Sequence, residues 1–205
     1  MNYLVPFLLF KNLIVIVNPL LVALIYLHLR PKIKEEQKRV EVFQIFLVSS
    51  LLGLMVSFFG KGILHFLGLS IDYIKMAGGL MIISSAWGML GRKDKYEDSR
   101  SAALSKSIIN PIVIPICMGG GTISIILTTT ASLPFQVGVI FSTSTAIILT
   151  YGLTALCCYF GEYLKKFVGD NIIEIFTILC AFIMLAIGLT MVIEPIKALW
   201  LAPAQ

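Results

Sequence analysis

Apolar residues fill six long stretches of this chain, and polar residues are largely confined to the short segments between them. Each stretch reaches the length of about 20 residues that a helix needs to cross the hydrocarbon core of a bilayer. The pattern therefore predicts an all-α integral membrane protein with six transmembrane helices. The expected spans are 7–29, 40–59, 71–90, 107–131, 135–160 and 172–193.

Composition agrees with this prediction. Hydrophobic residues make up 58% of the chain and charged residues only 13%, whereas a soluble domain carries about 25% charged residues. The formal net charge of +5 is spread over short runs between the apolar stretches, which does not indicate a nucleic-acid-binding protein. The partner that the composition predicts is the lipid bilayer.

Loop charge predicts the orientation. The segments after spans one, three and five share one side of the membrane and together contain twelve Lys and Arg residues, against four on the other side. Cytoplasmic segments carry the excess of Lys and Arg in membrane proteins. Both termini are therefore expected to lie outside, with the basic loops in the cytoplasm.

Two Asn-Pro pairs interrupt apolar spans, Asn18-Pro19 in span one and Asn110-Pro111 in span four. Proline has no N–H and breaks the helical hydrogen-bond ladder, and the lipid offers no replacement partner. Broken helices are therefore expected in spans one and four.

An odd number of spans separates the two pairs, so corresponding halves would enter the membrane with opposite polarity. This arrangement is typical of 3+3 inverted-topology repeats, in which substrates bind between the broken helices near the midplane. The predicted organisation is one membrane domain, with repeats at 1–91 and 107–205 and a cytoplasmic linker at 92–106.

Span four contains a second break signal. Three consecutive glycines are poor helix formers, so we expect the helix to unwind there and restart at about Thr122. The amino end of a restarted helix suits an anionic group such as a carboxylate. The candidate substrate-binding residues are Asn18, Asn110, Gly119, Gly120, Gly121, Thr122 and Ser124, and the helix-breaking residues are Pro19, Pro111 and Pro115.

Each of these features also has a structural interpretation. The asparagines would then only satisfy the backbone at the kinks, and the glycines would only let two helices cross closely. Span five carries six hydroxyl side chains, which in membrane helices usually bond their own backbone or a neighbouring helix. They are Ser142, Thr143, Ser144, Thr145, Thr150 and Thr154.

No ionisable side chain lies near the centre of any predicted span, and the four cysteines lie in apolar stretches where they resemble packing residues. Such a pattern predicts neither a catalytic nor a metal site and no cofactor, so an enzyme is not expected. A site built from amides, hydroxyls and helix ends suits a solute with balanced charge. Coupling to H⁺ or Na⁺ stays open.

Two segments, 67–90 (LGLSIDYIKMAGGLMIISSAWGML) and 110–124 (NPIVIPICMGGGTIS), together with the Asn18-Pro19 span, resemble the MarC family of six-span membrane proteins. The resemblance covers nearly the whole chain. It implies a protein of the cell inner membrane that transports small neutral amino acids, within the lysine-exporter-like superfamily. The chain departs from the family pattern at Leu20-Leu21-Val22-Ala23, where a Gly and a second Pro are usual, and at Gly120, where Pro is usual.

The leading hypothesis is thus a secondary transporter whose small-molecule substrate binds between spans one and four. A structural or regulatory membrane protein is the alternative, and a channel is a third interpretation, disfavoured because no filter motif or ring-forming charge is present. The sequence is compatible with both a monomer and a homo-oligomer.

Overall fold

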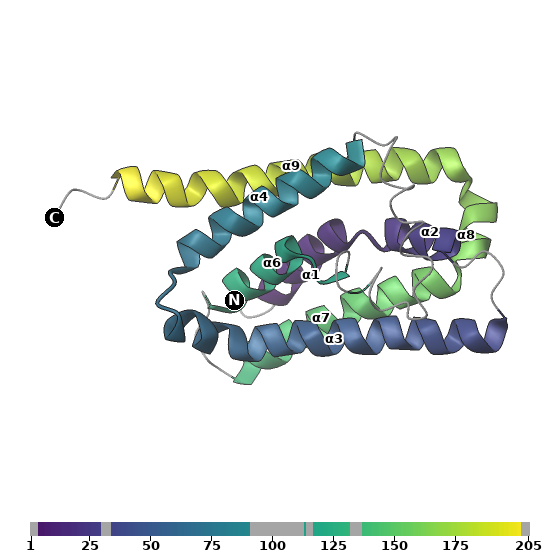
Figure 1. Ribbon diagram of the computed structural model, residues 1–205, viewed down its shortest axis with the longest axis horizontal. Helices are drawn as coiled ribbons and strands as arrows, with labels where there is room; N and C mark the ends of the chain where they lie inside the picture. The colour runs from purple at the N-terminus through teal and green to yellow at the C-terminus, as the bar shows by residue number, and fades with distance from the viewer. Residues whose placement is uncertain (1–3, 30–33, 91–112, 114–116, 132–136, 202–205) are drawn as a thin grey trace.

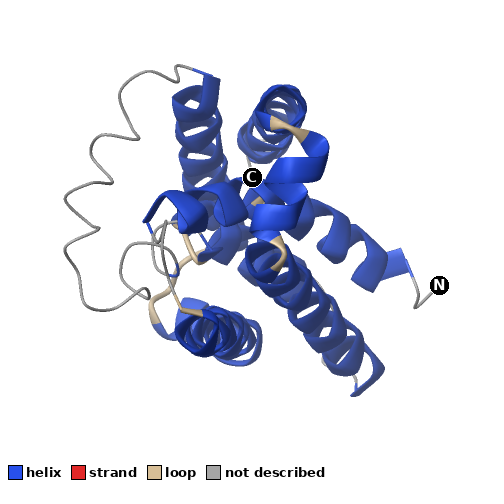
Figure 2. Ribbon diagram, turned by 90° about the vertical axis from the view of Figure 1, so that its right-hand side faces the viewer, coloured by secondary structure: helices blue, strands red, loops and turns tan. Residues whose placement is uncertain are grey.

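The computed structural model describes residues 4–29, 34–90, 113, 117–131 and 137–201. All regular structure in these residues is helical (Figure 1 and Figure 2). The helices are α1 (Leu4–Val17), α2 (Pro19–Leu29), α3 (Glu35–Phe66), α4 (Ile71–Leu90), α6 (Gly120–Ala131), α7 (Val137–Tyr159), α8 (Gly161–Val168) and α9 (Asp170–Leu201).

The helices form three layers. In Figure 1, α4 and α9 make the upper layer and α3 and α7 the lower one, with α1, α2 and α6 between them. The packing agrees, because α4 lies against α9, α3 lies against α7, and the middle helices contact both layers. The two interrupted spans therefore occupy the interior of the bundle.

Four apolar segments are long enough to cross a bilayer: Phe7–Leu27, Glu35–Phe66, Gly138–Tyr159 and Ile175–Ala198. They coincide with predicted spans one, two, five and six. Predicted span three forms the 20-residue helix α4, with Asp72 in its first turn. Of span four, the described part contains a shorter apolar helix, α6. The chain thus has the several apolar helices of an integral membrane protein.

Two helices are longer than the predicted spans. Both α3 and α9 have 32 residues. The predicted spans are shorter because an apolar stretch indicates only the part of a helix that lies in the hydrocarbon. The charged segment before span two continues α3, and Glu35 and Glu36 in its first turn complement the helix dipole. The α3 helix ends at Phe66, and Gly68, two residues later, has a φ of 66° that suits a left-handed carboxyl cap.

The segment between spans five and six was expected to be a simple loop but forms α8. Gly161 at its start packs closely on Leu27 of α2, whereas Tyr163 and Phe167 are 72% and 94% exposed. These two rings are one helical turn apart and share a face of α8. Such an amphipathic helix suits the boundary between hydrocarbon and head groups.

A polar cluster ties this end of the bundle together. The Lys38 side chain is only 3% exposed, and its Nζ lies 3.3 Å from Glu162 Oε1 of α8 and 5.5 Å from the centre of the Tyr159 ring. The hydroxyl of Tyr26 donates to Glu41 Oε2 at 3.3 Å, which joins α2 to α3. These contacts fix the relative height of α2 and α3.

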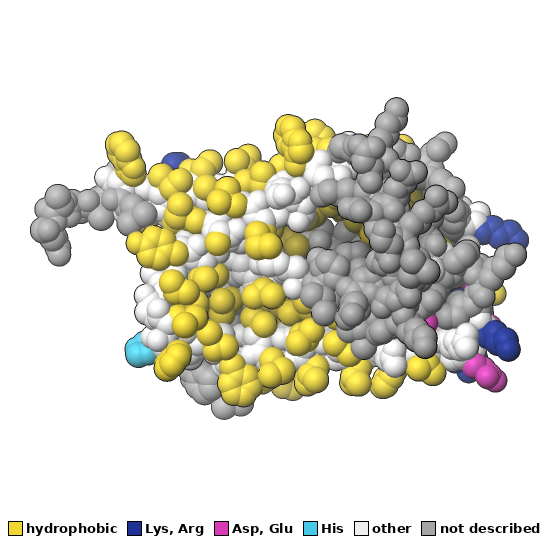
Figure 3. All heavy atoms as spheres, viewed as in Figure 1, with side chains coloured by type: hydrophobic (Ala, Val, Ile, Leu, Met, Phe, Trp, Pro, Cys, Tyr) yellow, Lys and Arg dark blue, Asp and Glu magenta, His cyan; other side chains and the backbone are white. Residues whose placement is uncertain are grey.

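The surface of the bundle is apolar over most of its length. Figure 3 shows hydrophobic side chains spread across the visible face, and Lys, Arg, Asp and Glu side chains gathered mainly at one end. Exposed large side chains include Phe66, Trp87, Phe141 and Trp200, each more than two-thirds exposed. A soluble monomer rarely exposes so much contiguous apolar area, so this surface fits contact with lipid.

The α4–α9 crossing depends on glycine. A Cβ atom built on Gly79 would lie 2.7 Å from the carbonyl oxygen of Gly188, and one on Gly188 would lie 2.9 Å from the carbonyl oxygen of Gly79. Backbones can approach this closely only where side chains are missing, as is common between membrane helices.

We therefore expect Gly79→Ala to destabilise the protein, because the added methyl group meets backbone atoms that cannot rotate away. Overpacking of this kind costs about 1–3 kcal/mol, which corresponds to roughly 2–10 °C in Tm for a chain of this size. Thermal unfolding in detergent measures the change. Gly152→Ala is the matched control, because its nearest neighbour would be Phe46 at 3.8 Å. An equal Tm for the two variants would contradict the close crossing.

Candidate functional site

The first helix break lies at Asn18. Its φ of 47° is in the left-handed region that non-glycine residues seldom adopt. The Asn18 N–H still donates to the carbonyl of Ile14 at 2.9 Å, so α1 is complete up to this residue. Because Pro19 has no N–H, the carbonyl of Val15 lacks the donor that a continuous helix would supply. The predicted break in span one is present.

The Asn18 side chain has one satisfied end and one unsatisfied end. Its Oδ1 accepts a hydrogen bond from the N–H of Leu21 at 3.3 Å and so caps the start of α2. Its Nδ2 is buried and has no hydrogen-bond partner among the described residues. Water cannot readily replace that partner, because Asn18 as a whole is only 1% exposed. Leaving such a donor unpaired costs about 1–3 kcal/mol, and a bound polar group would recover that cost.

The second break precedes α6. The N–H of Met118 reaches back five residues to the carbonyl of Val113 at 2.9 Å, which is a π-type turn. Gly119 follows outside any helix, and α6 begins at Gly120, two residues before the expected restart at Thr122. Asn110, Pro111 and Pro115 lie outside the described residues.

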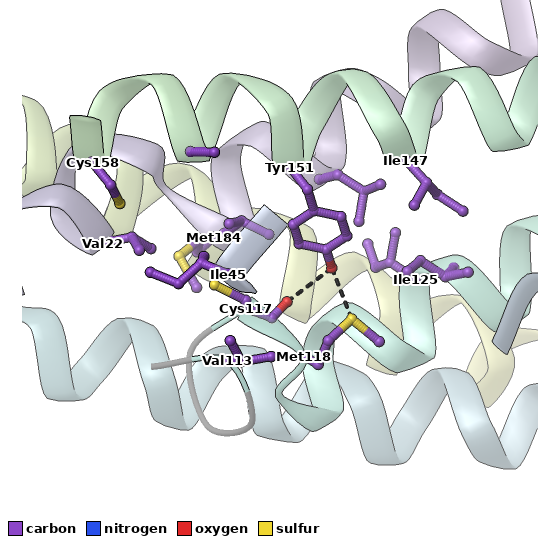
Figure 4. Close-up of a cluster of buried hydrophobic side chains, with 14 of the residues drawn as sticks. Val22, Ile45, Val113, Cys117, Met118, Ile125, Ile147, Tyr151, Cys158 and Met184 are labelled. Carbon is purple, nitrogen blue, oxygen red and sulfur yellow. Dashed lines mark hydrogen bonds between the residues drawn. The ribbon is translucent and has the colours of Figure 1, made fainter. Parts of the chain in front are cut away.

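Tyr151 of α7 completes the second break. Its hydroxyl donates to the carbonyl of Cys117 at 3.0 Å, and the Met118 sulfur lies 2.8 Å from the Tyr151 hydroxyl oxygen (Figure 4). The side chain is 1% exposed. Sequence reasoning missed this residue, although it is a tyrosine within the predicted apolar span five. Its position inside an apolar span is the signal that could have identified it, because a buried tyrosine hydroxyl usually has a hydrogen-bond partner.

The glycines and Ser124 face α4. Side chains added at Gly120 and Gly121 would collide with Met81 and Ile82, and Ser124 fills the space next to Gly78. The Ser124 hydroxyl donates to the carbonyl of Ile74 at 2.7 Å. These positions therefore take part in a close crossing of α6 and α4, as the structural interpretation of the glycines expected. Thr122 is also buried, at 2% exposure.

The hydroxyls of span five mostly bond their own helix. Thr143, Thr150 and Thr154 donate to the carbonyls four residues earlier at 2.8–3.0 Å. Ser142 and Thr145 likewise donate to carbonyls of preceding residues of α7. This is the usual behaviour of such residues in membrane helices, and it leaves little polarity for a path along α7.

The two breaks share one cluster of buried side chains. Val17 and Val22 flank the first break, Cys117 and Met118 belong to the second, and all four lie in the same hydrophobic cluster as Tyr151. Figure 4 shows Val22, Cys117, Met118 and Tyr151 within one close-up view. We call this region, comprising Asn18, Cys117–Gly120 and Tyr151, the double break.

Two further polar groups are buried without partners, Ser49 Oγ and Ser50 Oγ on α3. Ser49 lies beside the thiol of Cys117, which is only a weak hydrogen-bonding group. Neither serine was identified from the sequence, since no pattern distinguishes them from other serines in apolar spans. Within the described part of the chain, polar atoms without partners thus occur at the first break and on α3, and no residue of the double break carries a charge.

Comparison with known proteins places the chain in context. A family model described as "MarC family integral membrane protein" matches residues 3–200. A UPF0056 membrane protein of Buchnera aphidicola is 27% identical over 80% of this chain and 79% of its own length. A UPF0056 membrane protein of Methanocaldococcus jannaschii is 24% identical over 92% and 94%, respectively. No solved structure matches the chain.

The hydrogen bond from Tyr151 should be important for stability. Tyr151→Phe leaves the buried Cys117 carbonyl without that donor, which costs about 1–3 kcal/mol. The expected result is a Tm several degrees lower in detergent. Tyr163→Phe is the matched control, because it makes the same change on an exposed ring. If both variants unfold at the wild-type Tm, the hydroxyl does not hold the second break.

Proposed function

The chain belongs to the MarC family of integral membrane proteins, and from this premise we propose that it is a secondary transporter of small neutral amino acids or similar zwitterions. The observation that carries the proposal is the unpaired, buried Asn18 amide at a break in a membrane helix. A buried donor without a partner is a group that a polar solute can satisfy.

The charge of the double break fits a zwitterion. The carboxyl end of α1 presents the free carbonyl of Val15 and a partial negative charge, whereas the amino ends of α2 and α6 present partial positive charges. A solute with one positive and one negative group can use both kinds of helix end. A solute with net charge would need an ionised partner, which these residues do not supply.

The packing supports a 3+3 inverted repeat. If span one corresponds to four, two to five and three to six, the contacts between spans one and four (α1 with α6), two and five (α3 with α7) and three and six (α4 with α9) each map onto themselves. The contact of span one with α7 then maps onto that of α6, in span four, with α3. The contact of α4 with α6 maps onto that of α9 with the two helices of span one, α1 and α2. All of these contacts occur, as a two-fold axis through the double break requires. Transport would proceed by rocking one repeat against the other.

The proposed location is the inner (plasma) membrane, with the basic end in the cytoplasm. Lys34 and Arg39 at the start of α3 and Lys166 of α8 are exposed, and the cluster around Lys38 joins these two helices at the same end. An excess of Lys and Arg is typical of cytoplasmic segments. Both termini would then face outward.

A structural or regulatory membrane protein is the second candidate. It is favoured by the contacts of Gly120, Gly121 and Ser124 with α4, since these residues would then serve packing alone. It leaves the buried Asn18 donor without a role, because Asn18 Oδ1 by itself caps α2. This difference makes Asn18 the residue that separates the two functions.

Uptake by liposomes containing the purified protein tests the proposal. The wild type should take up radiolabelled alanine, glycine or serine saturably, with and without ion gradients across the membrane. Asn18→Gly should abolish uptake or lower it at least about tenfold, the effect of losing a hydrogen bond to a charged group. Glycine keeps the left-handed backbone and costs only a few tenths of a kcal/mol as a cap, so Tm should hardly change.

Asn12→Gly is the control, with the same substitution in the middle of α1, and should keep wild-type uptake. Failure of the wild type to move any of the three amino acids would contradict the proposal. So would an Asn18→Gly variant that transports normally. Flux that rises linearly with concentration would favour a channel.

A further inference from the structure

The unpaired Asn18 donor has a counterpart on α3. Three buried side-chain atoms lack hydrogen-bond partners in the described part of the chain, namely Asn18 Nδ2, Ser49 Oγ and Ser50 Oγ. Asn18 and Ser49 are 1% and 0% exposed. Two unpaired polar groups in one apolar bundle cost several kcal/mol together unless something else satisfies them in the working protein.

The register of α2 and α3 puts Asn18 and Ser49 at the same depth. The helices are antiparallel (Figure 1), and Tyr26 bonds Glu41 between them. Val22 lies four residues before Tyr26 in α2, and Ile45 lies four residues after Glu41 in α3. Both belong to the same buried cluster and appear together in Figure 4. Four more residues lead to Asn18 and Ser49, each about 12 Å from the Tyr26–Glu41 bond at 1.5 Å per residue.

Ser49 also lies beside the second break. Its side chain contacts the thiol of Cys117, whose backbone carbonyl accepts a hydrogen bond from Tyr151. The Asn18 amide belongs to the first break. The two groups therefore lie at one level of the bundle, Asn18 at the first break and Ser49 next to Cys117 of the second.

From this geometry we infer that Ser49 is a solute-binding residue, and that Asn18 Nδ2 and Ser49 Oγ together hold the carboxylate of the transported solute. The inference rests on the proposed function and makes it more specific. Both groups can donate hydrogen bonds, and a carboxylate offers two oxygens that accept them. Gly120 and Gly121, in contrast, are packed against α4, so the carboxylate site moves from the glycines to α3.

A functional test compares Ser49→Ala with Ser50→Ala. The two serines are adjacent, buried and unpartnered, but they project from α3 about 100° apart. Ser49→Ala should raise the KM for alanine uptake about tenfold with little loss of thermal stability, because the only described polar contact of the hydroxyl is the weakly bonding thiol of Cys117. Ser50→Ala should keep the wild-type KM. Unlabelled alaninamide, which lacks a carboxylate, should not compete with alanine.

A geometric test does not depend on transport. In a background with the four native cysteines replaced by alanine, Asn18→Cys and Ser49→Cys should be joined in the membrane by a bifunctional thiol reagent with a short spacer, because a carboxylate held between the two side chains separates them by more than a disulfide spans. The Asn18→Cys and Ser50→Cys pair should not. Cross-linking with the reverse preference would overturn the assignment even if the Ser49→Ala variant failed to fold.

The outcomes separate this inference from the function on which it rests. A wild-type protein that transports alanine, with a Ser49→Ala variant of unchanged KM, overturns the role of Ser49 alone. Effective competition by alaninamide overturns the carboxylate assignment. A wild-type protein that transports none of the amino acids overturns the proposed function, and this inference with it.

Discussion

A helix broken inside an apolar bundle must find partners for the backbone groups that it releases, because neither lipid nor packed hydrocarbon side chains can bond them. The rest of this structure depends on how that requirement is met at two places. At the first break, Asn18 caps α2 with its own oxygen. At the second, α7 supplies the Tyr151 hydroxyl to the Cys117 carbonyl. Both solutions are uncharged and buried, but only the first is local in the sequence.

The two breaks differ in the hydrogen-bonding groups that remain without a partner. Tyr151 has a single hydroxyl hydrogen, and the Cys117 carbonyl and Met118 sulfur surround its oxygen. Asn18 is an amide with both an acceptor and a donor, and among the described residues only the acceptor has a partner. A kink that needed only a cap would be served by serine, threonine or aspartate. The surplus donor is therefore the feature that a purely structural role does not explain.

The layers around the double break bury most of its residues. The outer pair α4 and α9 crosses at Gly79 and Gly188 with backbones in close contact, while the Lys38–Glu162 contact ties α3 to α8 at the basic end. The tight α4–α9 crossing is thus uncharged, and the charged contact lies at one end of the bundle, away from the breaks.

Sequence predicted the part of this arrangement that local chemistry determines. Proline and three glycines predicted the breaks, and apolar length predicted the spans, because both act on the backbone where they occur. Partner choice could not be predicted in the same way. Tyr151 and Ser49 acquire their roles from the packing of α3 and α7 on the double break, and the close contact of Gly121 with Ile82 depends on the depth at which α4 crosses α6. The sequence did not predict the amino-terminal part of α3 or the helix α8, because charged residues outside the hydrocarbon leave no apolar signal.

If Asn18 binds the solute, its side-chain amide gains a hydrogen-bond partner when the solute enters. The side-chain ¹⁵N resonance of Asn18, identified by its loss in the Asn18→Gly variant and recorded in lipid bilayers, measures this directly. We expect glycine, alanine and serine to shift the Asn18 side-chain signal and to leave that of Asn12 in place. An Asn18 signal that does not move at saturating solute would contradict it.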